Sequence, residues 1–316
     1  SLPEGFKRHG GVLVPMSTRA TLASGVTGKG TELVPAGQGE LIELLRAKAI
    51  VLALGARLFT GFTGPVEFPK VTAGGNISWM AENPGADAGD SDPTLGLALL
   101  TPKTMIGVVP FTRQLLNQAS IDVEAFVKDE LAIYHSLAID KAAIHGKGAN
   151  GEPTGIYKAL EVNAKAFGSA IPDIVGLMDM IVAVADRNAD IGTLKFLASV
   201  VLAGRLRVTQ EFAGTSGATI WQGNLRDGSI LGYGASASTQ ASKTMTGSEE
   251  TGGVEQALIF GNWADLLVAL FGQMELVVDV VTRKKRAIIE VASYQQGDCL
   301  PRHGQSFTKA TAALAA

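Results

Sequence analysis

The amino-acid sequence predicts an α+β fold, because one long helical segment stands between strand-rich segments and a region of mixed helices and strands. Apolar residues recur at helical spacing over residues 120–146, which predicts the helix. Strand-like runs bounded by turn residues occupy 57–111 and 273–295. From 171 to about 265 helices and strands alternate, and the 316 residues of the chain suffice for a sizeable core.

The N-terminal residues 1–40 predict an extended arm. They are rich in Gly, Ser, Thr and Pro, and their short apolar patches cannot form an independent core. Such an arm is either disordered or laid across a neighbouring molecule. After it, "ELIELLRAKAIVLALGA" predicts a short helix from Glu40 to about Ala53.

Residues 57–111 predict a long β-hairpin. Its strand-like runs are "VEFPKV", "NISWMA" and "LGLALLTPKTMIGVVPF". Between them lies the acidic segment "ENPGADAGDSDP", with Glu82, Asp87, Asp90 and Asp92 and no basic residue. Asp90 and Asp92 partly fit the alternating spacing of Ca²⁺ ligands, but the later glutamate of an EF-hand loop is absent. We interpret the segment as a solvated loop or one ordered by a basic neighbour. An isolated two-stranded hairpin is marginal in water, so this one is expected to rest on something else.

The strongest periodic signal predicts a single long helix, about 36 Å at 1.5 Å per residue. Ser120 or Asp122 can cap its start, and Gly146 and Gly148 end it. The apolar positions at helical spacing are Val123, Phe126, Val127, Leu131, Tyr134, Leu137, Ala138 and Ala142.

The second half predicts a central sheet and a further hairpin. "IPDIVGLMDMIVAVADRN" and "VVLAGRLRVTQ" are helix-like, whereas "TLKFLAS", "SILGY" and "QALIFGN" are strand-like. Then "QMELVVDVV", the basic turn Arg283–Arg286 and "AIIEVASYQQ" predict a β-hairpin. The last segment, from Cys299 onward, predicts one more short strand. We interpret the basic turn as solvated rather than as an anion site.

Composition limits the possible functions. With 27 basic and 30 acidic residues the net charge is −3, which argues against a chain whose main work is gripping the nucleic acid backbone. The single cysteine, Cys299, excludes an intrachain disulfide and fits a reducing compartment. No apolar run reaches the length of a membrane span. Only 18% of residues are charged, which fits either a surface covered by partners or a glycine-rich soluble enzyme.

The glycine-rich stretch "HGKGANGEPTGI", His145–Ile156, poses the choice between a phosphate-binding loop and a turn. A P-loop needs a Ser or Thr after its lysine and a helix directly behind it, and both are missing here. The glycines more simply allow the positive φ angles that end a helix and reverse the chain. We therefore predict a structural turn.

No set of residues predicts catalysis, a cofactor or a metal. The four histidines are scattered, and no zinc-binding spacing accompanies them. Cys299 is interpreted as an inert buried thiol. The prediction is therefore a non-enzyme with no catalytic, cofactor-binding or metal-binding residue. The histidines are His9, His135, His145 and His303.

These pieces, in this order, resemble the major capsid proteins of tailed phages of the Hong Kong 97 type. The resemblance is strongest over Val109–Ile156, and elsewhere it depends on the order of the elements. Family members show an "SRQLL"-like start, then a long helix and "G-E-P-x-G-I". The matching residues here are Arg113, Gln114, Leu115, Leu116, Asp122, Phe126, Val127, Asp140, Gly146, Gly148, Gly151, Glu152, Pro153, Gly155 and Ile156.

The resemblance implies a fold with N-arm, E-loop β-hairpin, long spine helix, P-domain sheet and α/β A-domain. Family precursors often carry an N-terminal scaffolding segment that a phage protease removes. The resemblance therefore implies either that the chain beginning at Ser1 is such a matured product or that it uses a separate scaffolding protein. The implied domains are the N-terminal arm, 1–40; a linker helix, 41–59; the E-loop, 60–108; the P-domain with spine helix, 109–156 and 266–298; and the A-domain, 157–265 and 299–316.

By the same resemblance, the chain is a capsid protein that assembles with itself, as hexamers and pentamers, into an icosahedral shell around double-stranded DNA. Implied partners are scaffolding, portal and decoration proteins and, non-specifically, the packaged DNA; no membrane is implied. The implied location is the virion, after assembly in the bacterial host cytoplasm. Some relatives join subunits through a lysine of the E-loop and an asparagine of the P-domain. Because 81–95 has no lysine and 273–295 no asparagine, we expect a shell without these crosslinks.

Two other functions stay open at this stage. An encapsulin-like nanocompartment would share the fold but enclose enzyme cargo instead of DNA. A glycine-rich α/β hydrolase or nucleotide-binding enzyme would need a convergent acid–base set, and none is visible in the sequence. An enzyme would elute as a small oligomer, whereas a shell protein would elute as pentamers, hexamers or particles.

Overall fold

The structure is a computed structural model, which describes residues 6–9, 12–15, 46–75, 77, 79, 92–118, 123–212, 214 and 217–314. The chain forms two compact units, Ser1–Arg46 and Ala47–Ala316. In the first unit β1 (Phe6–His9) pairs antiparallel with β2 (Val12–Pro15). The remainder of the predicted arm falls outside the described residues.

The second unit begins at a helix much shorter than predicted. Residues 46–50 are not helical, so the predicted helix from Glu40 to Ala53 is wrong there, and among the described residues of that range only α1 (Val51–Leu54) is helical. Asp140 explains the start, because its carboxylate accepts hydrogen bonds from the backbone N–H groups of Ile50 and Val51, at 2.9 and 2.7 Å. Gly55, at φ 121°, ends the helix. Burial raises the pKa of the Asp140 carboxyl, against the effect of these two hydrogen bonds.

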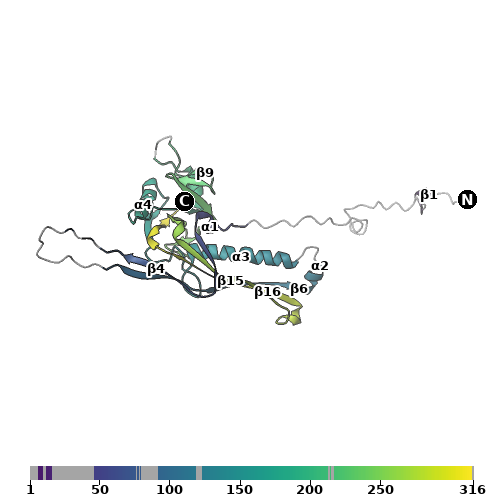
Figure 1. Cartoon of the computed structure of the whole chain (residues 1–316). Coiled ribbons are helices and arrows are strands. Elements are labelled where there is room, and N and C mark those ends of the chain that lie inside the picture. Colours follow the sequence, from purple (N-terminus) through teal and green to yellow (C-terminus); the bar gives the residue numbers. More distant parts are fainter. Residues whose placement is uncertain are drawn as a thin grey trace. The chain divides into compact units, whose positions relative to one another are not determined.

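A four-stranded sheet with the order β3-β15-β16-β6 forms the elongated part of this unit (Figure 1). Its long strands β15 and β16 are the predicted second hairpin, which is thereby confirmed, and each extends to 14 residues. Their pairing is regular except for a register shift between Phe271 and Glu275. The strands are β3 (Arg57–Phe62), β6 (Lys103–Thr112), β15 (Leu266–Asp279) and β16 (Ile288–Pro301).

The predicted long helix is α3 (Val123–His145), which lies along β16 and β6 and follows the short α2 (Arg113–Gln118). Val127 and Leu131 pack on Val291, as the periodicity predicts. Tyr134, however, is 50% exposed and Phe126 is also exposed, so the prediction that they face the core is wrong. The buried side chain one turn after Leu131 is a polar one, His135. The candidate caps Ser120 and Asp122 are not among the described residues.

The predicted hairpin forms a separate two-stranded sheet of β4 (Val66–Ala73) and β5 (Thr94–Leu100). The hairpin is shorter than predicted, because residues 103–108 pair with β16 of the four-stranded sheet and not with β4. The prediction of a strand at "NISWMA" is wrong for its described residues Ile77 and Trp79, which belong to no strand. The base of the hairpin packs on an aromatic cluster that includes Phe59, Phe62, Phe68 and Phe271.

The predicted mixed region forms a seven-stranded sheet with the order β7-β17-β14-β8-β11-β10-β9. Its predicted helices are confirmed, and so are the strands predicted at "TLKFLAS" and "QALIFGN". The single strand predicted at "SILGY" is wrong, because Leu231 and Gly232 form the turn between two strands, and the strand at 163–170 was not anticipated. Helices α4 (Ile174–Ala185) and α5 (Val200–Val208) pack on one face of it. Its strands are β7 (Asn163–Ala170), β8 (Leu194–Ser199), β9 (Gln222–Gly223), β10 (Gly228–Ile230), β11 (Tyr233–Ser238), β14 (Leu258–Asn262) and β17 (Phe307–Ala313). A separate two-stranded sheet pairs β12 (Met245–Thr246) with β13 (Glu249–Glu250).

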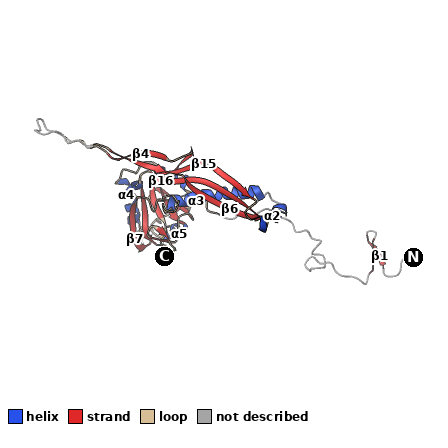
Figure 2. Cartoon of the chain, turned by 90° about the horizontal axis from the view of Figure 1, so that it is seen from below, coloured by secondary structure: helices blue, strands red, loops and turns tan. Residues whose placement is uncertain are grey.

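The opposite face of the seven-stranded sheet joins the two parts of the unit. Leu197 and Ile259 of this face pack with Ile144 at the end of α3 and with Val268 of β15. Alternate residues of β8 and β14 therefore belong to two different cores, as a sheet covered on both faces requires. Figure 2 shows the strand-rich body with α3 alongside its long strands. No helix within the described ranges combines the length and apolar character that a membrane crossing requires.

Candidate assembly interface

The hairpin β4–β5 leaves one of its two faces uncovered. Strand alternation in "TLGLALL" places Leu95, Leu97 and Leu99 on one face and Gly96, Ala98 and Leu100 on the other. The second face is the one that packs on the aromatic cluster, and Leu100 is fully buried there. The first face is open to solvent: Leu95 is 74% and Leu97 62% exposed. Val71 lies directly opposite Leu95 and is also exposed, which extends the apolar surface across both strands.

The four-stranded sheet also has an uncovered apolar face, which is the face away from α3. In register, Val108 and Val277 flank Ala292, and Ile106 lies opposite Tyr294. Ile106 is 62% exposed, and Val108, Val277 and Tyr294 are exposed as well. The alternate residues Gly107, Val109 and Val291 face α3 and are covered.

Helix α4 has a single charged residue, Asp179, and is otherwise apolar, including on its outer side. Leu177, Met180, Ile181 and Val184 face the core. Val175, Met178 and Val182, spaced at i, i+3 and i+7, are all exposed on the outer side. Contiguous exposed apolar patches of this kind mark protein–protein contact surfaces. The hairpin face, the outer sheet face and the outer side of α4 are therefore the candidate assembly interface.

The glycine-rich loop after α3 is a turn held by its own backbone. Gly146 donates to Ala142 O at 2.8 Å, Gly148 to Pro153 O at 3.0 Å, and Gly155 to Gly146 O at 3.0 Å. Ile156 and Tyr157 then donate to Ala143 O and Ile144 O, so the chain doubles back onto the last turn of α3. These N–H groups already have acceptors and cannot all face a phosphate. A Cβ on Gly155 would come within 2.5 Å of the Gly146 nitrogen, which explains the glycine there.

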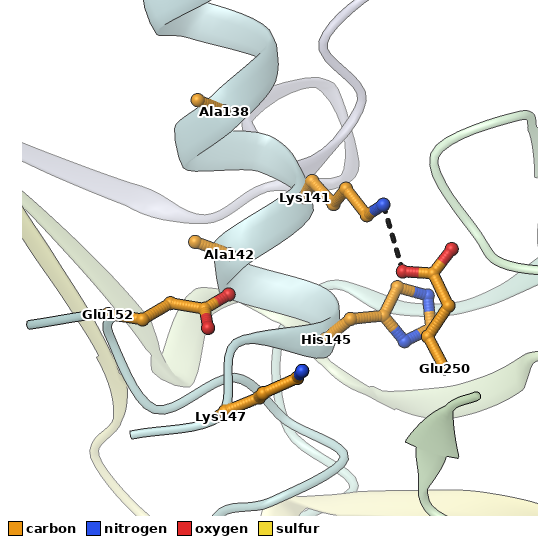
Figure 3. A pocket seen from close by; sticks show the side chains of 7 residues that line it. All are labelled: Ala138, Lys141, Ala142, His145, Lys147, Glu152 and Glu250. Carbon is orange, nitrogen blue, oxygen red and sulfur yellow. Dashed lines mark ion pairs between the residues drawn. The ribbon is translucent and has the colours of Figure 1, made fainter. Parts of the chain in front are cut away.

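A pocket of about 390 Å³ lies beside this loop (Figure 3). Lys141 and Glu250 form an ion pair at 2.8 Å on one side of it, and Lys147 and Glu152 line it from the loop. His145 stacks on Tyr157, with ring centroids 5.2 Å apart, and its Nε2 accepts a hydrogen bond from Ser242 N–H.

Burial lowers the pKa of His145 to about 4, with nearby Glu250 opposing and Lys141 adding to the effect. The imidazole is therefore neutral at ordinary pH, and its acceptor nitrogen is already occupied. Glu250 also accepts from the Ser242 hydroxyl at 3.1 Å. This arrangement stabilises the junction of α3 with the seven-stranded sheet and does not assemble an acid–base pair.

The other residues singled out from the sequence lie apart from one another. His135 Nε2 is 2.7 Å from Ser293 Oγ beneath α3, and burial lowers the pKa of this histidine. His303 lines a different pocket, and the side chain of His9 is not described. Cys299 is buried, which raises the pKa of its thiol. Within the described ranges, no group of three or more His, Cys, Asp and Glu side chains is placed to hold a metal ion.

The two charged segments differ in how much the structure describes. Of the acidic residues between β4 and β5, only Asp92 is among the described residues. The basic turn is exposed at the end of β15–β16, where Arg283 pairs with Glu290 at 2.9 Å. Asp279 organises this turn by accepting from the N–H groups of Val281 and Thr282.

Comparison with known proteins gives consistent matches. The profile of the Phage capsid family matches residues 30–312. The "Major capsid protein" of Halomonas phage phiHAP-1 is 30% identical over 276 residues, which are 86% of this chain and 42% of that protein. That of Klebsiella oxytoca phage phiKO2 is 34% identical over 134 residues, 42% of this chain and 31% of that protein. The chain thus spans less than half the length of these curated relatives.

Solved structures resemble the fold at low sequence identity. The capsid of a native GTA particle, computed with C5 symmetry, superposes with a TM-score of 0.73 at 16% identity, covering 92% of this chain and 99% of that one. A chain of Microbacterium phage Oxtober96 superposes with a TM-score of 0.68 at 13% identity, covering 92% and 99%. The α+β fold predicted from the sequence, with its hairpin, long helix and two sheets, is therefore confirmed as the fold of these structures.

Proposed function

The chain belongs to the phage capsid family, and on that premise we propose that it is a major capsid protein that assembles with copies of itself into an icosahedral head shell around the double-stranded DNA of a tailed phage. The observation that carries this proposal is the uncovered hairpin face. Leu95, Leu97 and Leu99 project from a two-stranded ribbon that has no core of its own.

A second copy supplies what one copy lacks. Full burial of a leucine side chain stabilises by about 1.5–3 kcal/mol, so covering these three leucines offsets much of the entropy that association costs. The outer sheet face, with Ile106, Val108 and Val277, is an apolar surface of similar kind for the hairpin of a neighbour to cover. Because the two surfaces differ, their contact is heterologous, and heterologous contacts close into rings such as pentamers and hexamers.

The finer assignments belong to the same proposal. We assign 1–40 to an N-terminal arm, 41–59 to a linker and 60–108 to the E-loop, with the P-domain in 109–156 and 266–298 and the A-domain in 157–265 and 299–316. Scaffolding, portal and decoration proteins and non-specifically bound DNA are the proposed partners. The proposed location is the virion, after assembly in the bacterial cytoplasm.

Expression of the chain followed by electron microscopy and sedimentation tests the proposal. The wild-type chain should form capsomers or closed particles. Leu97→Asp should fold with an unchanged melting temperature yet remain unassembled, because it places a charge in the centre of the hairpin face. Val254→Asp is the matched control, since Val254 is as exposed but lies outside the three apolar surfaces.

Two results would contradict the proposal. A wild-type chain that stays monomeric at high concentration would remove its basis, and so would full assembly of Leu97→Asp. Particles that hold enzyme cargo and no DNA would instead favour the nanocompartment.

A further inference from the structure

We propose that a pocket lined by three arginines, Arg57, Arg187 and Arg302, binds the acidic segment between β4 and β5 of a second copy of this chain. The pocket has a volume of about 490 Å³ and lies where the start of β3, the residues after α4 and the end of β16 meet. This inference rests on the proposed self-assembly and names a contact within it. The segment contributes the carboxylates Glu82, Asp87, Asp90 and Asp92.

The pocket is built around one buried carboxylate. Asp265, only 6% exposed, accepts from Ser306 Oγ at 2.7 Å and from Asn262 Nδ2 at 3.3 Å. It also pairs with the Arg302 guanidinium at 3.0 Å, and Arg302 N–H donates to its backbone carbonyl at 2.7 Å. Asn262 is held in turn by Ile191 O at 2.6 Å. These contacts place Arg302 in the wall of the pocket before any ligand arrives.

The pocket carries more positive charge than its own residues neutralise. Asp265 balances Arg302, but Arg57 and Arg187 have no ion-pair partner among the residues that the structure describes. His303 adds an imidazole ring to the lining. Arg302 Nε is buried and has no acceptor within the described part of the chain. A buried donor without an acceptor costs about 1–3 kcal/mol, so an incoming oxyanion that accepts from it is stabilised.

A carboxylate fits these donors. Guanidinium groups present planar forks of N–H donors that bind carboxylates in a bidentate manner, more strongly than neutral hydrogen bonds. Because these donors line a concave pocket, they suit a side chain that enters from a loop. Duplex DNA is bound instead by a stripe of cations along the phosphate backbone, and this pocket includes a buried acid at its centre.

The acidic segment is the complementary partner that this chain offers. Between Glu82 and Pro93 there are four acidic residues and no basic one. Strand β4 spans about 26 Å from the hairpin base, at about 3.3 Å per residue over its eight residues. That base packs beside β3, the strand that Arg57 begins. The distance between that base and the far end of β4 favours a second copy, rather than the same chain, as the source of the segment.

A charge exchange between copies tests the contact with the full chain. The first variant carries Arg57→Glu and Arg187→Glu, and the second carries Asp90→Lys and Asp92→Lys. Each alone should lower the yield of particles by about tenfold or more, because like charges then face each other at every contact. Mixing the two variants should restore assembly, since each pocket then meets a segment of opposite charge on the other variant. Arg226→Glu, an exposed arginine away from the pocket, is the matched control.

Each outcome decides something. All variants should keep the wild-type melting temperature, because Arg57 and Arg187 are exposed. Unimpaired assembly of the first variant would overturn the inference. Rescue only when all four substitutions are in one chain would place the contact within a single copy and would also overturn it. Loss of packaged DNA from the first variant alone would assign the pocket to phosphate. Failure of the wild-type chain itself to assemble would refute the proposed function instead.

Discussion

His145 makes the stability of this fold depend on pH in a direction that can be worked out from its surroundings. Burial at the end of α3 holds its pKa at about 4, against 6.5 for an exposed histidine. The folded state therefore keeps the imidazole neutral, whereas the unfolded state takes up a proton below about pH 6.5. Because the unfolded state binds more protons, stability falls as the pH drops from about 6.5 to about 4 and changes no further below that.

The size of this effect follows from the shift. A difference of 6.5 to about 4, at about 1.4 kcal/mol per unit, corresponds to about 3 kcal/mol lost across the window. Other groups titrate there too, and the buried Asp140 acts in the opposite sense because its pKa is raised. A comparison with His145→Gln isolates the histidine, since glutamine loses the stacking on Tyr157 at every pH alike.

The assay is urea unfolding of the dispersed subunit at about pH 7 and about pH 4.5. The wild-type chain should lose about 2 kcal/mol more than His145→Gln between these conditions, because pH 4.5 stops short of the lower end of the window. If the two chains lose the same amount, the buried neutral imidazole is not the cause, and the reasoning is wrong.

Three further predictions concern the turn after α3, the hydrogen bond of His135 and the absence of covalent crosslinks. Gly155→Ala should destabilise the fold by about 3 kcal/mol or more, because its Cβ would meet the Gly146 nitrogen at 2.5 Å; Gly204→Ala, in open space within α5, should instead stabilise by about 0.5–1 kcal/mol, and equal effects in urea unfolding would refute the steric argument. Ser293→Ala should cost about 1–3 kcal/mol by leaving buried His135 unpaired, and a neutral result would contradict this. Mature particles should give no covalent ladder on a denaturing gel, because 81–95 lacks lysine and 273–295 lacks asparagine; a ladder would disprove it.

Features governed by local chemistry were predictable from the sequence. The end of α3 was predicted from its glycines, because a backbone that must turn sharply and lie against itself admits no Cβ. The β15–β16 hairpin was predicted from its strand-like runs and basic turn. Both depend on residues close together in the chain.

Features governed by distant residues were not predictable. Periodicity marks the apolar positions on α3 but does not say which of them contact the sheet. His135 is buried there because it hydrogen-bonds to Ser293, which is 158 residues away in the sequence. Residues 46–50 of the helix predicted from Glu40 are not helical, and the helix described at Val51 begins where Asp140, 89 residues on, binds the Val51 N–H group. The arginine pocket joins residues 57, 187 and 302, so no sequence motif could have revealed it.

The paired strands β15 and β16 pass through three hydrophobic clusters, with Val268 in one, Phe271 in the next and Leu276 in the last. A ribbon anchored at so many points transmits force along its length, because neither strand can slide without disturbing several cores. Its pairing is interrupted at one place, between Phe271 and Glu275, where Gly272 adopts φ 65°. Any curvature that a closed particle imposes on its subunits would therefore concentrate at this glycine, and copies in differently curved surroundings would differ there first.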